Sequence, residues 1–244
     1  MIFTCKTETG KRKRNEDSSF VPEPGSALSF VAVADGMGGH AGGAVASRIV
    51  IDTLREQLKD LPDRDEDGRL LEAVNAANAA VLDAAEKDPS LRGMGSTLVA
   101  AALYRDRFTA VNVGDSRLYH LSGRRFTQVT HDHSFVAMLV EAGHITEAEA
   151  RVHPNRNMIT RAIGTEREAR PDLFHCTWKK GDVLLLCSDG LCGTLAPDAM
   201  RKILSDRHRT PDEKADELIR AALDAGSSDN ITVVLAVCEG GSRG

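Results

Sequence analysis

Residues 96–130 read STLVAAALYRDRFTAVNVGDSRLYHLSGRRFTQVT, and this stretch is the most informative about the fold class. It holds four short runs that are apolar or alternate between apolar and polar residues: 98–104, 108–113, 117–121 and 125–129. Turn-forming pairs separate the runs: Arg105-Asp106, Gly114-Asp115 and Ser122-Gly123. Short runs joined in this way are typical of antiparallel strands connected by tight turns. The stretch therefore predicts an antiparallel meander.

Helical patterns lie on both sides of these strands. Upstream, apolar residues recur every three or four positions over 44–58, and residues 70–85 are rich in Ala and Leu, so both segments are predicted to be helices. Downstream we expect helices over 134–142, 146–151, 197–204 and 211–225. Further strands are expected over 28–34, 183–187 and 231–237. Helices packed on antiparallel sheet give an α+β fold.

The composition is that of an ordinary folded protein. The 244 residues are 41% hydrophobic and 27% charged, which excludes a disordered or collagen-like chain. The formal net charge is −5, so no global positive field favours a nucleic acid or an anionic membrane as a partner.

The sequence also bears on the cellular compartment. The longest apolar run, residues 98–104, is far shorter than the roughly 18 to 20 residues of a membrane-spanning helix. The N-terminus turns polar too early to form a secretory signal. The five cysteines are an odd set without paired C-x-x-C units, which favours buried, reduced thiols. We expect a cytoplasmic monomer.

Aspartates stand where the predicted strands begin or end. Asp35 follows the run FVAVA, Asp189 follows LLLCS, Asp229 precedes the run ITVVLAV, and Asp115 lies in a turn between two strands. Taken singly, each is explained as a good turn former. If the four converge, their like charges raise one another's pKa unless cations neutralise them, and carboxylates without His or Cys partners suit Mg²⁺ or Mn²⁺. Two such ions bridged by one Asp are suited to activating water against a phosphoryl group.

A glycine-rich segment suggests a competing function. Residues 36–41, GMGGHA, fit the pattern G-x-G-x-x-[G/A] between a strand and a helix, which is typical of dinucleotide binding. That fold needs a parallel strand soon after the helix, whereas a second helix and a meander follow here. The order of elements therefore disfavours the dinucleotide interpretation.

Taken together, these segments resemble the metal-dependent serine/threonine protein phosphatases of the type 2C family, specifically its compact bacterial members. The resemblance runs nearly end to end and rests on ordered motifs: RKRNEDS from Arg12, VADGMGGHAGG from Val33, GSTLVAA from Gly95, VGDSRLY from Val113, THDHS from Thr130, EAGHITEAEARVHPNRNMITRAIG from Glu141, CSDGL from Cys187 and SDNITVVL from Ser228.

The resemblance implies one domain over residues 1–244, built as a four-layer α-β-β-α sandwich of two antiparallel sheets, with a two-metal site at one end and a flap at about 142–164. Asp35 is similar to the carboxylate that bridges both Mn²⁺ or Mg²⁺ ions. The other positions that match metal-site residues of the family are the Gly36 carbonyl, Asp189, Asp229 and Glu16, with Asp115 for a weaker third ion and Asp17 and Asn230 in support.

The same resemblance gives Arg12 the place of the family's phosphate-binding arginine, three residues before Asn15. A guanidinium fork suits a phosphate dianion. By itself, the run Lys11 to Arg14 would be a solvated basic patch. The implied mechanism is direct attack on phosphorus by a water that bridges the metals, with no covalent phosphoenzyme.

The source of the leaving-group proton stays open at this point. Many eukaryotic relatives have a histidine two residues after the bridging Asp, where this chain has Met37. His40 and a metal-bound water are the two candidates. The spacings of His131, His133, His144 and His153 fit no zinc motif. Cys187 lacks the Cys-x₅-Arg arrangement of a cysteine phosphatase, which favours a buried thiol.

The resemblance implies an enzyme that removes phosphate from phosphoserine and phosphothreonine in proteins and opposes a bacterial serine/threonine kinase. The alternative is a catalytically silent member that binds phosphoproteins or a kinase. Loss of Asp35, Asp189 or Asp229 would favour the silent module, and all three are present.

Overall fold

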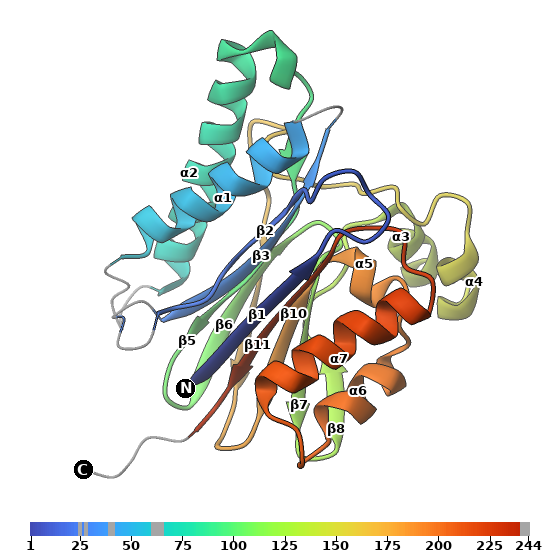
Figure 1. Ribbon diagram of the computed structural model, residues 1–244. Helices are drawn as coiled ribbons and strands as arrows, with labels where there is room; N and C mark the ends of the chain where they lie inside the picture. The colour runs from blue at the N-terminus through green and yellow to red at the C-terminus, as the bar shows by residue number, and fades with distance from the viewer. Residues whose placement is uncertain (24–25, 27–28, 39–41, 60–65, 240–244) are drawn as a thin grey trace.

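The computed structural model describes residues 1–23, 26, 29–38, 42–59 and 66–239. Two antiparallel sheets pack face to face (Figure 1). In the first sheet the order is β1 (Ile2–Glu8), β11 (Ile231–Val237), β10 (Val183–Cys187), β7 (Arg117–Ser122) and β8 (Arg125–Gln128). In the second the order is β2 (Asp17–Phe20), β3 (Phe30–Met37), β5 (Leu98–Leu103), β6 (Arg107–Val113) and β9 (Asp172–Thr177), and the short β4 (Gly95–Ser96) pairs with β3.

Helices cover the two outer faces of the sheet pair (Figure 1). The second sheet is covered by α1 (Gly42–Gln57) and α2 (Glu66–Lys87), and the first by α6 (Pro197–Leu204) and α7 (Pro211–Asp224). The shorter helices are η1 (Pro89–Leu91), α3 (Phe135–Glu141), α4 (Glu147–Val152) and α5 (Asp189–Cys192). No helix in the described ranges is long and apolar enough to cross a membrane.

The alternation of side chains along β3 explains the layers. Phe30 and Ala32 pack against α1 and α2, while Val31 and Val33 pack against the other sheet. Successive side chains of a strand point to opposite faces, and both faces of β3 are buried, so its sequence is continuously apolar. The predicted α+β class and the four-layer α-β-β-α sandwich are confirmed.

One expected turn is part of a strand. The sequence predicted that the strand near residue 34 would stop at Asp35, but β3 continues to Met37. Gly36 and Met37 pair with Ser96 and Gly95 of β4, which extends the ladder beyond the apolar run. Asp35 is therefore held inside a strand rather than in a loop.

The predicted meander is wrong in its pairing. All four strands exist, but β5 and β6 belong to the second sheet and β7 and β8 to the first. The chain changes sheets at Gly114, whose φ of 107° is unfavourable for residues with side chains. A Cβ at this position would lie 2.7 Å from the Thr97 Cβ, so the crossing requires glycine. As a result, Asp115 stands between the two sheets.

Candidate active site

Acidic side chains from both sheets meet at one end of the sandwich. Asp17 begins β2 directly opposite Asp35 in β3. From the first sheet, Asp189 follows β10 and Asp229 precedes β11, and Asp115 lies at the crossing between β6 and β7. The predicted convergence of aspartates is therefore what the structure contains, and it draws on strands that are far apart in the sequence.

The electrostatics of these side chains reflect burial and mutual repulsion. Burial raises the pKa of Asp35 well above its ordinary value, and the charges of Asp17, Asp189, Asp115 and Asp229 raise it further. Burial, followed by the charges of Asp229 and Asp17, raises the pKa of Asp189 to about 6. Burial also raises the pKa of Asp115, and Asp189 adds to this effect. Such a group of carboxylates favours nearby positive charge.

Individual oxygen atoms in this group lack partners. Buried Oδ1 atoms of Asp17 and Asp189 have no hydrogen-bond partner within the described ranges. No group of three His, Cys, Asp or Glu side chains in the same ranges already surrounds a single point, so cation binding requires some rotation of these side chains. Hard oxygen donors, two unsatisfied atoms and strong repulsion together fit Mg²⁺ or Mn²⁺.

Glu16 and Gly36 lie side by side next to this group. The Gly36 N–H donates to the Glu16 carbonyl over 3.1 Å. A Cβ on Gly36 would lie 2.0 Å from the Gly43 carbonyl oxygen, so glycine is required for this close approach to α1. Asn230 fixes the same segment because its Oδ1 accepts the Glu16 N–H over 2.8 Å and its Nδ2 donates to the Arg14 carbonyl over 3.0 Å.

Arg12 supplies a guanidinium group at the edge of the site. Its side chain is 56% exposed and donates to Asp229 Oδ2 over 2.7 Å. This hydrogen bond raises the pKa of Arg12, and the charges of Asp229, Asp189 and Glu16 contribute in the same direction. An exposed guanidinium beside the carboxylates is well suited to meet an incoming phosphate.

A comparison with models of protein families shows to which family the chain belongs. Residues 7–225 match the family model described as protein phosphatase 2C. The chain belongs to the protein phosphatase 2C family. It is therefore a phosphatase of the 2C type, as its sequence motifs predicted.

Relatives of this 2C phosphatase come from several bacteria. The serine/threonine phosphatase stp of Listeria monocytogenes is 39% identical over 235 residues, covering 94% of this chain and 93% of that protein. The phosphatase PstP of Mycobacterium tuberculosis is 42% identical over 237 residues, which cover 96% of this chain but 44% of PstP.

Solved structures agree with this assignment. The structure of Stp1 from Staphylococcus aureus matches with a TM-score of 0.92 at 36% identity, covering 98% of this chain and 95% of that one. The catalytic domain of PstP in complex with two manganese ions matches with a TM-score of 0.86 at 39% identity, covering 97% of each chain. The prediction of Mn²⁺ or Mg²⁺ as cofactor is thus consistent with the family.

Two residues of the motif after Asp35, Met37 and His40, bear on the leaving-group acid of this 2C phosphatase. His40 lies outside the described residues. Met37 lies in β3, paired with Gly95, and a thioether has no proton to donate. The role of His40 therefore stays a prediction.

Sequence reasoning missed the hydroxyl groups that hold the carboxylates. The Ser188 hydroxyl donates to Asp17 Oδ2 over 2.8 Å and accepts the Thr232 N–H over 3.0 Å, which ties β2 to the first sheet. Thr97 Oγ1 accepts the Asp35 N–H over 3.0 Å. Ser188 directly precedes Asp189, so the motif CSDG contained a signal that was not used.

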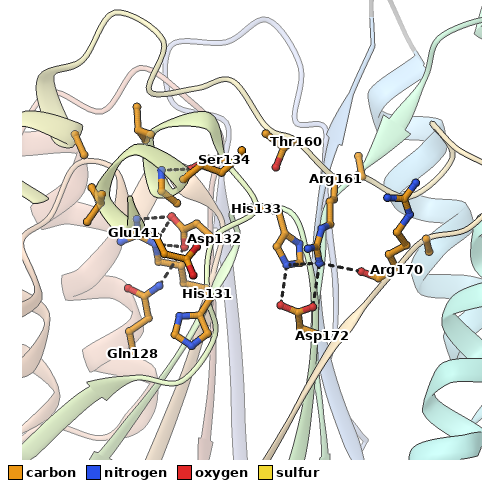
Figure 2. Close-up of a pocket in the computed structure, with 18 of the residues that line it drawn as sticks. Gln128, His131, Asp132, His133, Ser134, Glu141, Thr160, Arg161, Arg170 and Asp172 are labelled. Carbon is orange, nitrogen blue, oxygen red and sulfur yellow. Dashed lines mark hydrogen bonds and ion pairs between the residues drawn. The ribbon is translucent and has the colours of Figure 1, made fainter. Parts of the chain in front are cut away.

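A cavity of about 740 Å³ adjoins the site on the side of the flap segment, residues 142–164 (Figure 2).

His133 lies between this cavity and the Asp115 turn. Its Nδ1 accepts the Gly114 N–H over 3.1 Å, so the proton of the neutral ring resides on Nε2, which lies 3.1 Å from both Asp172 Oδ2 and Arg161 Nη1. Burial lowers the pKa of His133. Arg161 donates to the other oxygen of Asp172 over 3.0 Å, so this histidine is a structural link and not a metal ligand in the described geometry.

Proposed function

We propose that residues 1–244 form one phosphatase domain that hydrolyses phosphoserine and phosphothreonine in proteins. The observation that supports this most directly is the group of buried carboxylates, with raised pKa values and unsatisfied oxygens, in a chain of the 2C family. The names of its relatives specify serine/threonine phosphatases, which supports the same substrate class.

The acidic groups would hold two Mn²⁺ or Mg²⁺ ions. Asp35 would serve both ions, and the remaining ligands would be the Gly36 carbonyl, Glu16, Asp189 and Asp229, with Asp115 for a weaker third ion. Such ions, when bound, lower the pKa of water and neutralise charge on a phosphoryl group. Asp17 and Asn230 act indirectly: Asp17 faces Asp35 across β2 and β3, and Asn230 fixes the backbone of Glu16.

Arg12 binds the phosphoryl oxygens of the substrate. Its guanidinium exchanges the half-buried Asp229 carboxylate for the phosphate dianion, and a bidentate fork orients the phosphorus toward the cluster of carboxylates that would hold the ions. The proton for the leaving serine or threonine oxygen would come from His40 or from a water held by a bound ion.

The proposal extends to the cellular setting. Substrates of this chemistry must be supplied by a protein kinase that phosphorylates serine and threonine, so a cognate kinase is the expected functional partner. We place the enzyme in the cytoplasm as a monomer, and its five free cysteines suit a reducing compartment. Light scattering and cell fractionation test these two statements.

Hydrolysis of a phosphothreonine peptide tests the proposed function. The wild type is assayed with EDTA, Mg²⁺ or Mn²⁺ and compared with Asp35→Asn and Arg12→Ala. Asp52→Asn is the matched control, because Asp52 is an exposed acid on α1 that pairs only with Arg55 in the described structure.

We expect activity that depends on Mn²⁺ or Mg²⁺. Asp35→Asn should lower kcat/KM by about a thousandfold or more, since several kcal/mol of charge stabilisation disappear. Arg12→Ala should lower it by about ten- to hundredfold, in keeping with the loss of a hydrogen bond between charged groups. A wild type that is inactive with every divalent ion would favour the silent binding module instead.

A further inference from the structure

A narrow cleft of about 150 Å³ lies between the cluster of site carboxylates and the flap segment. Asp115, Asp189 and Asp229 line it from the sheet side. Arg151, in the last turn of α4, and Arg156, in the following turn, line it from the flap side. In Figure 1, α3 and α4 stand beside α5 at the same end of the sandwich. The cleft therefore has an acidic wall and a wall that carries two guanidinium groups.

The two flap arginines differ in their partners from three other arginines near the site. Arg12, Arg117 and Arg161 each form an ion pair with an aspartate. Arg151 and Arg156 form no ion pair and no side-chain hydrogen bond within the described ranges, although both border the cleft. Their donors are thus available to an anion that enters it.

The flap segment holds these side chains on an ordered backbone. A capping box between Thr146 and Glu149 starts α4, which carries Arg151. The His153 carbonyl accepts the Arg156 N–H over 3.1 Å, and His153 Nδ1 accepts the Asn155 N–H over 3.1 Å. These local bonds set the turn that carries Arg156, so both arginines project from an ordered backbone.

The charge balance of the flap wall indicates the ligand; the rest of the lining is acidic and includes Asp132, which is paired with Arg117. A single acid of the flap side, Glu147, borders the same space, so two arginines leave that wall with an excess of positive charge. A substrate whose phosphoryl group lies at the carboxylate side extends its neighbouring residues by about 3.3 Å each along the cleft. Residues close to the phosphorylated one therefore pass the flap wall.

We propose that Arg151 and Arg156 bind an acidic group of the substrate, a carboxylate or a second phosphate, within a few residues of the phosphoserine or phosphothreonine. This inference rests on the proposed phosphatase function. It makes the enzyme selective for acidic or multiply phosphorylated segments, and it assigns that selectivity to two specificity-determining residues of the flap.

The test compares peptides that share one phosphothreonine and differ only in their flanking residues. The flanks are glutamine, glutamate, lysine or a second phosphothreonine. For each protein, the quantity of interest is the ratio of kcat/KM between the acidic and the glutamine peptide, because any general loss of activity cancels in that ratio. The variants are Arg151→Gln/Arg156→Gln, the charge-retaining Arg151→Lys/Arg156→Lys, and the control Arg124→Gln in the exposed turn after β7.

The wild type should prefer the acidic peptides over the glutamine peptide by about five- to tenfold, mainly through KM, since exposed charge pairs contribute up to about 1 kcal/mol each. The double glutamine variant should lose this preference, while the double lysine variant and Arg124→Gln should keep most of it. Added NaCl should weaken the wild-type preference. A larger ratio for the second phosphothreonine than for glutamate would identify phosphate as the preferred anion.

Three results would overturn the inference. The first is an equal kcat/KM ratio in the wild type and the double glutamine variant, and the second is a wild type without preference for acidic peptides. The third is a uniform loss of kcat/KM on all peptides in the double glutamine variant, which would mean that the arginines act on the target phosphate. If the glutamine variant fails to fold, the salt dependence of the wild-type preference decides instead. Failure of the phosphatase function itself is distinct, because no peptide would then be hydrolysed with any metal.

Discussion

The repulsion between the site carboxylates predicts that one substitution stabilises the fold while it abolishes function. Asp189→Asn removes a negative charge but keeps the size of the side chain. In the absence of divalent cations, the variant should be more stable than the wild type at neutral pH. This outcome is unusual, because most substitutions at buried positions destabilise a protein.

The expected magnitude follows from the raised pKa of Asp189. Its rise from 3.8 to about 6 corresponds to about 3 kcal/mol of cost for ionising this group in the folded protein. The repulsion is shared with Asp229 and Asp17, so the expected gain is about 1 to 3 kcal/mol. For a chain of this length that is about 2 to 12 °C in Tm. Asp198→Asn is the matched control, because this acid on α6 is 90% exposed and should change the stability little.

The effect should depend on pH in a definite direction. Because the pKa is higher in the folded state than in the unfolded state, the folded state binds more protons between pH 3.8 and about 6. The stability of the metal-free wild type therefore falls as the pH rises through this range. At pH 5 the advantage of Asp189→Asn should shrink to about half of its value at pH 7.5.

Thermal unfolding in EDTA at pH 5 and 7.5, repeated with MnCl₂, measures these quantities. With Mn²⁺ the order should reverse, because ligand binding to the folded state stabilises the wild type more than a variant that lacks a ligand. The reasoning is refuted if Asp189→Asn in EDTA is destabilised by the same amount at both pH values.

Three further predictions concern the framework of the site. Gly36→Ala should destabilise the fold by about 2 kcal/mol or more in urea unfolding, because its Cβ would lie 2.0 Å from a backbone oxygen of α1; an unchanged midpoint would contradict the packing. Arg117→Met should cost about 3 kcal/mol by the same measurement, since it leaves Asp132, which is 10% exposed, without its bidentate partner. Asn230→Ala should abolish slow amide exchange at Glu16 and raise KM for phosphopeptides, and retained protection at that amide would show that Asn230 does not hold this segment.

The parts of the fold that the sequence predicted best are those with both faces buried. The segments that became β10 and β11 are continuously apolar, and their predicted limits, 183–187 and 231–237, match the structure. Helices with a clear apolar stripe or a proline in the first turn, such as α6 and α7, were also predicted within one residue. Buried segments consist largely of apolar residues, so local sequence patterns are sufficient to predict their limits.

Edge strands have a weaker hydrophobic pattern in the sequence. β1, β2 and β9 were not predicted, because their side chains are largely half-buried or exposed and their sequences mix polar and apolar residues. Each gains its partner from a distant segment, as β1 does from β11. The change of sheets at Gly114 is equally non-local, because its need for glycine comes from Thr97 in another strand. The hydroxyl partners of the site, Ser188 and Thr97, required the same long-range information.

The position of the site carboxylates in the fold explains why these side chains cannot move apart. Asp35, Asp189 and Asp229 belong to or adjoin β3, β10 and β11, and each of these strands has a neighbour on both sides. Separating the carboxylates would break backbone ladders and expose the apolar layer between the sheets. The fold therefore holds like charges together against their repulsion, and a divalent cation that binds there meets carboxylates that are already gathered. For the same reason, metal binding and stability are coupled in this protein: the cation relieves a strain that the core enforces.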